Sequence, residues 1–247
     1  MMDKVKVKVE HLTKRFGDLL VLDDVSFDVR EGEFLCIVGP TGCGKTTFLN
    51  SLTKLYDITA GEILVDGEPV DLGRHNISYI FQENSSMPWL SVENNVSFGL
   101  DIKHVDAAEK KRRVDEMLEI VGLAPYRKYY PAQLSASMLQ RVAIARAFAT
   151  KPDLLLMDEP YGQLDIELRF KLEDELVKLW KATGTTVLFI THNIEESVYL
   201  AEKILVLTNK PTKIKELVID DLPRPRDIAS PDFVALRNKV TDLIKWW

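Results

Sequence analysis

A glycine-rich loop between an apolar stretch and a predicted helix constrains the fold of this chain more than any other feature. The apolar stretch 34–38 is typical of a buried strand, and the helix is predicted from about Lys45 to Lys54. The connecting loop consists of Gly39, Pro40, Thr41, Gly42, Cys43, Gly44, Lys45, Thr46 and Thr47. Glycines let consecutive backbone N–H groups point inward, and the helix N-terminus adds partial positive charge, so this loop favours an anion.

The spacing within the loop indicates that the anion is a nucleotide polyphosphate. Gly39, four further residues and then Gly44-Lys45-Thr46 form the P-loop pattern. Lys45 supplies a mobile charge for the β and γ phosphates, and the Thr46 hydroxyl is placed to bind Mg²⁺. A simple glycine-rich turn into a helix is the alternative, but the strand, the spacing, the Lys-Thr pair and the helix all agree with the P-loop. Cys43 in this loop is either somewhat reactive beside Lys45 or a spectator.

The composition is that of an ordinary globular protein, with 46% hydrophobic and 28% charged residues among 247. No stretch approaches about 18 consecutive apolar residues, and the N-terminus alternates charged with apolar residues, so we expect neither a membrane span nor a signal peptide. The formal net charge of −6 gives a nucleic-acid partner no overall electrostatic support, and we expect none. The two cysteines, Cys36 and Cys43, fit a reducing cytosol better than a disulfide.

The N-terminal segment predicts β structure. Val5, Val7 and Val9 alternate with lysines, and 20–29 is typical of a second strand. Phe16 lies in the polar loop predicted between these strands, where its ring could stack on a nucleobase or cap the small sheet. The residues alone leave both alternatives open. Two further strands are predicted at 61–65 and 77–81.

An apolar loop follows Gln82, which by itself is an ordinary exposed polar residue after a strand. The loop consists of Met87, Pro88, Trp89 and Leu90, a stretch that a soluble monomer has little reason to expose. We therefore predict a contact surface there. The alternative is that Trp89 is a core residue.

From about residue 91 to residue 150 the pattern becomes helical. Apolar residues at 114, 117, 118 and 121 share one face of a helix predicted at 107–121. The charged run 109–113 indicates the solvated face of that helix rather than a nucleic-acid site. Ser135 is a natural N-cap ahead of a second helix, predicted at 139–150.

Further residues suited to chemistry follow two apolar strands, 154–157 and 185–190. Asp158-Glu159 comes directly after the first strand, and His192 follows the second. Ligands of α/β proteins bind at the carboxyl ends of parallel strands. Beside a P-loop, this pattern favours a Mg²⁺-binding Asp158, a water-directing Glu159 and a phosphate-sensing His192 over mere loop polarity and a structural histidine.

The C-terminal third completes the predicted sheet and adds an appendage. Asp165 is predicted to cap a helix at 166–182, and strands follow at 204–207 and 214–219. The proline-rich segment 221–227 cannot be helical, and 231–247 has the spacing of an amphipathic helix.

The order of the P-loop, Gln82, Leu134-Ser135, Asp158-Glu159, Asp165 and His192 resembles the ATP-binding cassette (ABC) ATPase family over nearly the whole chain. The resemblance implies an ATP-hydrolysing enzyme with an α/β fold. It implies a P-loop NTPase core with a mostly parallel sheet, an N-terminal antiparallel β-subdomain and an inserted α-helical subdomain. We predict a single ABC ATPase domain over 1–247, with the core at about 1–90 and 151–220, the helical subdomain at about 91–150 and a C-terminal extension at 221–247.

The resemblance also implies a role for each motif, with ATP and Mg²⁺ as cofactors. The implied nucleotide-binding residues are Phe16, Gly39 to Thr47, Ser135 and Ser137, of which Phe16 would stack on adenine. The implied metal-binding residues are Thr46, Gln82 and Asp158. The implied catalytic residues are Lys45, Glu159 as the base and His192 at the γ-phosphate. Two cassettes of this family close head to tail, so the signature 134–138 of one would cover ATP on the other, with Asp165 at their interface.

Two shorter segments, 87–92 and 222–227, resemble the nitrate, sulfonate and taurine branch of bacterial ABC importers. This resemblance implies an energy-coupling subunit at the cytoplasmic face of the cell membrane, docked on integral membrane permease subunits through the groove beside Gln82. A second ABC ATPase subunit, identical or not, and a separate solute-binding protein would complete the system. One alternative is a soluble ABC ATPase of DNA repair or translation, but those typically carry long insertions, zinc modules or tandem cassettes. A P-loop small-molecule kinase would leave the signature and His192 unexplained.

The signature departs from the family pattern at Ala136-Ser137, where two glycines are usual. The two side chains are expected to crowd the close approach of a γ-phosphate or to strain the backbone by about 1–3 kcal/mol each where φ > 0 is needed. Either effect would weaken the ATPase activity, and the double change Ala136→Gly with Ser137→Gly would raise it. The alternative is that the loop relaxes around these small side chains. Tyr161 and Gln163 near Asp165 depart from the pattern as well.

Overall fold

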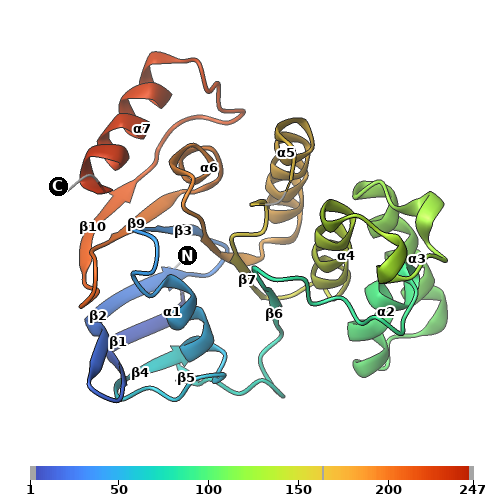
Figure 1. The fold of residues 1–247 in the computed structure, drawn as a ribbon, viewed down its shortest axis with the longest axis horizontal. Coiled ribbons are helices and arrows are strands. Elements are labelled where there is room, and N and C mark those ends of the chain that lie inside the picture. The colour runs from blue at the N-terminus through green and yellow to red at the C-terminus, as the bar shows by residue number, and fades with distance from the viewer. Residues whose placement is uncertain (1–3, 163, 245–247) are drawn as a thin grey trace. The chain divides into compact units, whose positions relative to one another are not determined.

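The computed structural model describes residues 4–162 and 164–244, so Gln163 and the last three residues of the predicted C-terminal helix lie outside the described residues. The chain forms two compact units. Unit 1 comprises the residues up to Asn76 together with those from Thr186, and unit 2 comprises Ile77–Thr185. Each unit has its own strands and helices (Figure 1). The predicted division into a core and a helical subdomain stays a prediction.

Unit 1 contains the predicted antiparallel sheet. Its strands are β1 (Val5–Phe16), β2 (Leu19–Arg30), β4 (Ala60–Val65) and β5 (Glu68–Pro69), in the order β2-β1-β4-β5. Val7 and Val9 are buried as their alternation predicts, and Phe27 of β2 packs on Phe48 with 5.4 Å between ring centroids. The prediction that Phe16 lies in a loop is wrong, because β1 pairs with β2 as far as Phe16 and only Gly17 and Asp18 form the turn.

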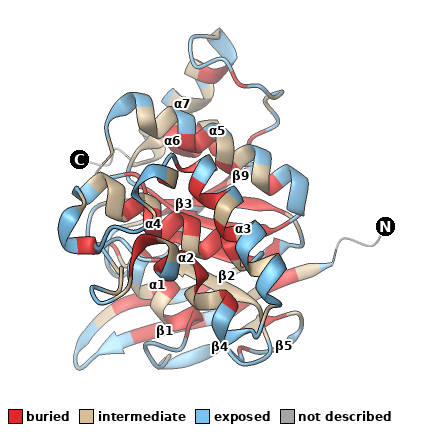
Figure 2. Cartoon of the chain, turned by 90° about the vertical axis from the view of Figure 1, so that its right-hand side faces the viewer, coloured by how far each residue is buried: buried red, intermediate tan, exposed pale blue. Residues whose placement is uncertain are grey.

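A second group of strands in unit 1 carries the P-loop. β3 (Phe34–Val38) lies between the parallel strands β8 (Thr186–Ile190) and β9 (Lys203–Leu207), and β10 (Ile214–Ile219) pairs antiparallel with β9. Every residue of β3 and β8 is buried, which explains their unbroken apolar sequences. Figure 2 shows β3 in the red of buried residues. The helices of this unit are α1 (Lys45–Leu52), α6 (Ile194–Leu200) and α7 (Pro231–Ile244). α6 packs on β3, and α7 packs on α6, β9 and β10.

Unit 2 combines a pair of parallel strands with a group of helices. β6 (Ile77–Ile80) and β7 (Leu154–Asp158) pair in register, so their carboxyl ends coincide. The helices are α2 (Val92–Ile102), α3 (Ala107–Ile120), α4 (Ala136–Ala149) and α5 (Ile166–Thr183), of which the first three pack on one another. Short 3₁₀ turns at Ala124–Tyr126 and Pro131–Gln133 connect α3 to α4. No helix in the described ranges has the length and apolar content needed to cross a membrane.

The charged run on α3 lies on the solvent side of that helix, as predicted. Val114, Met117 and Leu118 form its buried face. Glu109 pairs with Arg112 at 2.8 Å and with Arg113 at 2.6 Å, and these two arginines hold the pKa of the Glu109 carboxyl at about 2. Lys111, Arg112 and Arg113 of this run therefore pair with carboxylates of α3 itself, and Lys110 pairs with Asp101 of α2.

The structure corrects the predicted start of α4. The helix begins at Ala136 rather than Leu139, because the Ser135 hydroxyl accepts a hydrogen bond from the Met138 N–H at 3.2 Å and so caps the helix three residues earlier. Asp165 caps α5 in the same way, since its Oδ1 accepts from the Leu168 N–H at 2.9 Å. Other helix and strand ends differ from the prediction by one or two residues at most positions.

Candidate functional site

The P-loop of unit 1 runs from the end of β3 to the start of α1. Gly42 has φ +75° and Gly44, the N-cap of α1, has φ +116°, backbone conformations that only glycine adopts without strain. A Cβ on Gly44 would also lie 2.9 Å from Cγ1 of Val21 on β2. The tight curl of this loop therefore requires glycine at both positions.

Lys45 lies at the centre of the loop rather than in solvent. Its side chain is buried, and Nζ donates to the carbonyl oxygens of Gly39 at 3.0 Å and Pro40 at 3.1 Å. This arrangement places a positive charge against the concave side of the loop, at the N-terminal end of α1. Thr46 is exposed at the first turn of α1, so its hydroxyl is open to a ligand.

The surroundings of the Cys43 thiol favour the spectator alternative over the reactive one. It is buried, and burial raises the pKa of the thiol more than the neighbouring Lys45 lowers it. Its carbonyl oxygen accepts a short hydrogen bond from the Thr212 hydroxyl, which ties the loop to the segment before β10. A thiol with a raised pKa holds little reactive thiolate at neutral pH.

Phe16 lies at the end of β1 with a large part of its ring exposed. Its edge meets Tyr56 in a T-shaped contact at 5.4 Å, and Nζ of Lys14 lies 4.5 Å from the ring centroid. Lys14 in turn donates to the carbonyl of Asp57. Sequence reasoning did not identify Lys14 and Tyr56, since neither fits a motif, yet both orient the ring that is predicted to stack on a nucleobase.

His192 is exposed in the turn between β8 and α6, at the carboxyl edge of β8. β3 and β8 are parallel neighbours, so His192 and the P-loop follow the carboxyl ends of adjacent strands. The structure therefore brings the two predicted phosphate-contacting elements of unit 1 to one edge of one sheet.

Gln82, Asp158 and Glu159 come together in unit 2. Gln82 Nε2 donates to Glu159 Oε2 at 3.2 Å, and both residues follow the carboxyl ends of the paired strands β6 and β7. Asp158 is buried as the last residue of β7. The predicted metal-binding amide, metal-binding carboxylate and catalytic carboxylate thus share one strand edge.

The backbone of Glu159 is strained. Its φ is +45°, in the left-handed region where a residue with a long side chain costs about 1–3 kcal/mol. Such outliers persist where the surrounding structure holds them, and they cluster at functional sites. Six other non-glycine residues in the described ranges, Lys54 and Lys151 among them, also have a positive φ and lie outside the predicted site, so this conformation alone does not mark Glu159 as functional.

The signature residues lie at the N-terminus of α4, and the prediction of backbone strain there is wrong. Ala136 and Ser137 form the first turn of the helix, and neither has a positive φ. The Ser135 cap draws both residues into the helix, where small side chains need no special backbone. Their N–H groups belong to the first turn of α4, an end that attracts anions.

Each unit by itself carries donor groups of the kind that bind ATP or Mg²⁺. The curled P-loop offers backbone N–H groups and the Lys45 cation to phosphates, and the exposed Thr46 hydroxyl is a ligand of the kind that Mg²⁺ binds. The carboxylate of Asp158 and the amide oxygen of Gln82 are hard oxygen donors of the same kind. Thr46 belongs to unit 1, whereas Gln82, Ser135, Ser137, Asp158 and Glu159 belong to unit 2.

One buried side chain is hydrogen-bonded to both ends of the apolar loop after Gln82. Asn95 on α2 is fully buried, accepts from the Met87 N–H at 2.8 Å and donates to the carbonyl oxygens of Met87 at 3.1 Å and Leu90 at 3.0 Å. Trp89 between these anchor points is 72% exposed, so the alternative that it is a core residue is wrong. The sequence analysis did not identify Asn95. The only sign of its role in the sequence is that this polar residue stands next to the apolar Val96 of the helix.

A cavity of about 450 Å³ lies beside this loop in unit 2. It is lined by residues of β6, the following loop, α2 and α4, among them Tyr79, Phe81, Met87, Phe98 and Ile102. Arg146 of α4 closes one side and donates to the carbonyl oxygen of Ser85 at 2.8 Å. The predicted contact surface therefore consists of an exposed tryptophan next to a largely apolar hollow.

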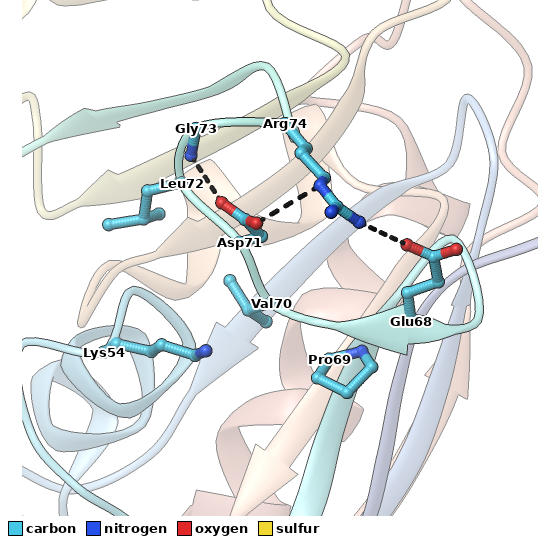
Figure 3. A pocket seen from close by; sticks show the side chains of 8 residues that line it. All are labelled: Lys54, Glu68, Pro69, Val70, Asp71, Leu72, Gly73 and Arg74. Atoms are coloured by element: carbon cyan, nitrogen blue, oxygen red, sulfur yellow. Dashed lines mark hydrogen bonds and ion pairs between the residues drawn. The ribbon is translucent and has the colours of Figure 1, made fainter.

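A different hollow, of about 680 Å³, lies in unit 1 and contains none of the predicted site residues (Figure 3). It is lined by Lys54 and by residues 68–74 of β5 and the loop after it. The polar groups of the loop pair among themselves: Asp71 accepts from the Gly73 N–H at 2.8 Å, and Arg74 lies 3.5 Å from Asp71 and 3.8 Å from Glu68 (Figure 3). These contacts leave the hollow without a converging set of ligand-binding groups.

Comparisons with known proteins agree with this geometry. A family model described as ABC transporter matches residues 22–162. An uncharacterized ABC transporter ATP-binding protein of Methanocaldococcus jannaschii is 43% identical over 98% of this chain and 92% of its own length. An aliphatic sulfonates import ATP-binding protein of Bacillus cereus is 39% identical over 94% of this chain and 91% of its own length.

Solved structures give the same result. An ATP-binding cassette solved as a dimer in a post-hydrolysis state with ADP and Pi is 31% identical, with a TM-score of 0.79 over 88% of this chain and 100% of that one. A dimeric bacterial ABC transporter cassette matches with a TM-score of 0.80 at the same identity and coverage. The α/β fold predicted from the sequence, with its antiparallel sheet and mostly parallel P-loop NTPase core, is thereby confirmed.

Proposed function

The chain belongs to the ABC transporter family, and we propose that it is the ATP-hydrolysing subunit that powers solute import through a membrane permease. ABC cassettes bind and hydrolyse ATP, and the identification of this chain as an ATP-binding cassette rests on its whole length. The import function is the finer proposal. The observation that carries it is the exposed Trp89 on a loop that a buried asparagine holds in place.

Within the ATPase cycle, the residues of this chain take the roles that their positions suggest. Gly39–Thr47 bind the phosphates through backbone N–H groups and Lys45, and Phe16 orients the base. Mg²⁺, when bound by Thr46, Gln82 and Asp158, neutralises charge on the phosphates. Glu159 orients the attacking water and accepts its proton, and His192 holds the γ-phosphate in place.

A second cassette completes the proposed machine. The solved relatives are dimers, and we place Ser135, Ser137 and the first-turn N–H groups of α4 against the γ-phosphate bound to the partner cassette, with Asp165 at the interface. Whether the second subunit is identical to this chain does not change the role of any residue named here.

The proposed partner on the membrane side is an integral permease that binds at Trp89 and the 450 Å³ cavity next to it. Aromatic side chains beside apolar hollows dominate protein interfaces. We therefore propose that the chain works at the cytoplasmic face of the membrane. A relative at 39% identity is named for aliphatic sulfonates import, which supports a solute of the nitrate, sulfonate and taurine class and a separate solute-binding protein. The relatives reported above lend no support to DNA repair or translation.

Replacing Trp89 by Ala is expected to weaken binding to the permease by roughly 2 kcal/mol or more, which is about thirtyfold in affinity. The isolated chain should keep its melting temperature and its ATP affinity, because the ring is 72% exposed and contributes little to the core. Pull-down of the full chain with solubilised permease measures the first quantity, and nucleotide titration measures the second.

Leu72→Ala is a matched control for this experiment. Leu72 is also a large exposed apolar side chain, at 56%, but it lies beside the hollow of unit 1 shown in Figure 3. Its removal should leave permease binding unchanged. Equal retention of permease by the Trp89→Ala variant and the parent chain would refute the docking surface.

The double change Ala136→Gly with Ser137→Gly is expected not to accelerate hydrolysis, since neither residue has a positive φ that glycine would relieve. Glycine in a helix lowers stability by about 0.5–1 kcal/mol per position, so a lower melting temperature is expected instead. Thermal melts and steady-state ATPase rates of both forms test this. A faster double-glycine form would mean that the two side chains crowd the phosphate.

A further inference from the structure

The proline-rich segment 222–227, which the proposed ATPase cycle does not use, returns to the C-terminal end of α6. Arg224 donates to the carbonyl oxygen of Tyr199 at 2.9 Å and also to that of Leu200. Arg226 donates to the carbonyl oxygens of Val198 at 2.7 Å and Ala201 at 2.6 Å. The last carbonyls of a helix have no partner within it and carry partial negative charge, so two guanidinium groups are well matched to this end of α6.

One of these arginines is buried together with a carboxylate. Arg226 Nη2 lies 2.9 Å from Asp220 Oδ1, and the two side chains are only 2% and 0% exposed. A buried ion pair seldom adds net stability, because removing both charges from water costs about as much as their attraction returns. The pair does impose one geometry, since Arg226 can satisfy both Asp220 and the α6 carbonyls only in a single position.

The opposite end of α6 is tied just as firmly, and His192 lies there. The Thr191 hydroxyl donates to Glu196 Oε2 at 2.6 Å and accepts from the Asn193 N–H at 2.9 Å. Asn193 caps the helix, since its Oδ1 accepts from the Glu195 N–H at 2.9 Å. The two residues that flank His192 are thus both bonded to the first turn of α6.

α6 is short enough to transmit a displacement from one end to the other. It has 7 residues, which corresponds to a rod of roughly 10 Å. Ser197 and Val198 are buried within it, and the helix packs on β3 and α7. A shift of its C-terminal end would therefore move its N-terminal end, and His192 with it.

We propose that Arg224 and Arg226 are positioning residues for His192, which act by holding the C-terminal end of α6. This inference rests on the proposed contact of His192 with the γ-phosphate. The arginines touch neither nucleotide nor metal in this role. They fix where the turn between β8 and α6 presents the imidazole, and a displacement of about 1 Å in a catalytic group can lower a rate by up to about a hundredfold.

The test is a double-mutant cycle on the full chain between Arg224→Met and His192→Ala, with steady-state hydrolysis of Mg²⁺-ATP and equilibrium ATP binding as readouts. Arg224→Met is expected to lower kcat about tenfold and to leave KM and ATP affinity within about twofold. In the His192→Ala background the same change should have no further effect on kcat, because the group that it positions is gone.

Arg237→Met is the matched control. Arg237 of α7 lies 3.6 Å from Glu195 of α6, and this half-exposed ion pair holds the first turn of α6 rather than its C-terminal carbonyls. This variant should hydrolyse ATP at the parent rate. A loss equal to that of Arg224→Met would show that any contact to α6 matters and would overturn the assignment to the two arginines.

A second variant guards against misfolding. Arg226→Met combined with Asp220→Asn removes the buried pair as a whole and leaves no lone carboxylate. It should repeat the loss in kcat and the coupling to His192. Three outcomes would each overturn the proposal. The losses in kcat could be additive in the His192→Ala background, kcat could be unchanged in both arginine variants, or both variants could fail to fold. His192→Ala with parent kcat would instead show that the proposed role of His192 is wrong, and the inference would fall with it.

Discussion

Replacing Glu159 by Gln is expected to lower the ATPase turnover number by about 10²–10⁴-fold while ATP still binds. Gln keeps the size of the side chain and one oxygen, but it cannot accept a proton from the attacking water. The carboxylate of Glu159 accepts a hydrogen bond from Gln82 Nε2 at 3.2 Å, which orients it at the strand edge. Phosphate release under saturating Mg²⁺-ATP measures the turnover number, and nucleotide titration measures the affinity.

A control for this prediction is Glu119→Gln on α3. Glu119 is an exposed carboxylate of the same unit and is far along the chain from Gln82 and from Asp158-Glu159. Its neutralisation should leave the turnover number and the ATP affinity unchanged. Because the Glu159→Gln variant binds ATP without consuming it, we also expect it to accumulate as a closed dimer in the presence of ATP. Turnover at the parent rate would show that another group activates the water.

Replacing Lys45 by Met is expected to weaken ATP binding by about thirtyfold or more. Removing one partner of a buried, hydrogen-bonded charge pair costs about 2–5 kcal/mol, and 1.4 kcal/mol corresponds to a factor of ten. Lys45 is buried against the concave side of the P-loop, where no other side chain of the loop carries a positive charge. Equilibrium titration with ATP, with and without Mg²⁺, measures the loss.

Lys54→Met provides the comparison for Lys45→Met. Lys54 follows α1 two residues beyond the helix and is exposed, so the same change of side chain removes a charge without touching the P-loop. The ATP affinity of the Lys54→Met variant should match that of the parent chain. If both variants bind ATP equally well, Lys45 does not contact the phosphates. A melting temperature for each variant separates lost binding from a collapsed loop, because Lys45 also bridges Gly39 and Pro40.

The parts of the fold that local pattern controls were predictable from the sequence. β3 and β8 are buried on both faces, so their unbroken apolar runs marked them, and the P-loop spacing located the turn into α1. The site followed from the same logic, because residues after parallel strands converge at one edge. Gln82 and Glu159 are 77 positions apart and yet in contact.

The remaining features depend on contacts that no local pattern records. The Ser135 cap, a single hydroxyl, decided whether Ala136 and Ser137 belonged to a loop or a helix, and the strain prediction was wrong for that reason. Phe16 belongs to β1 because the pairing of β1 with β2 continues through Lys14 and Arg15 to Phe16. Asn95 and Arg226 are ordinary polar residues in the sequence. Only the structure shows that one holds a loop and the other the end of a helix.

Uptake of labelled solute by cells whose only copy of this chain carries Glu159→Gln tests the proposed import function most directly. An alkanesulfonate, taurine and nitrate are supplied separately, and accumulation is compared with that in cells carrying the parent chain. Accumulation of at least one of these solutes is expected to be lost in the variant and restored by the parent chain. If accumulation of all three is unchanged although the purified variant no longer hydrolyses ATP, the chain does not power their import.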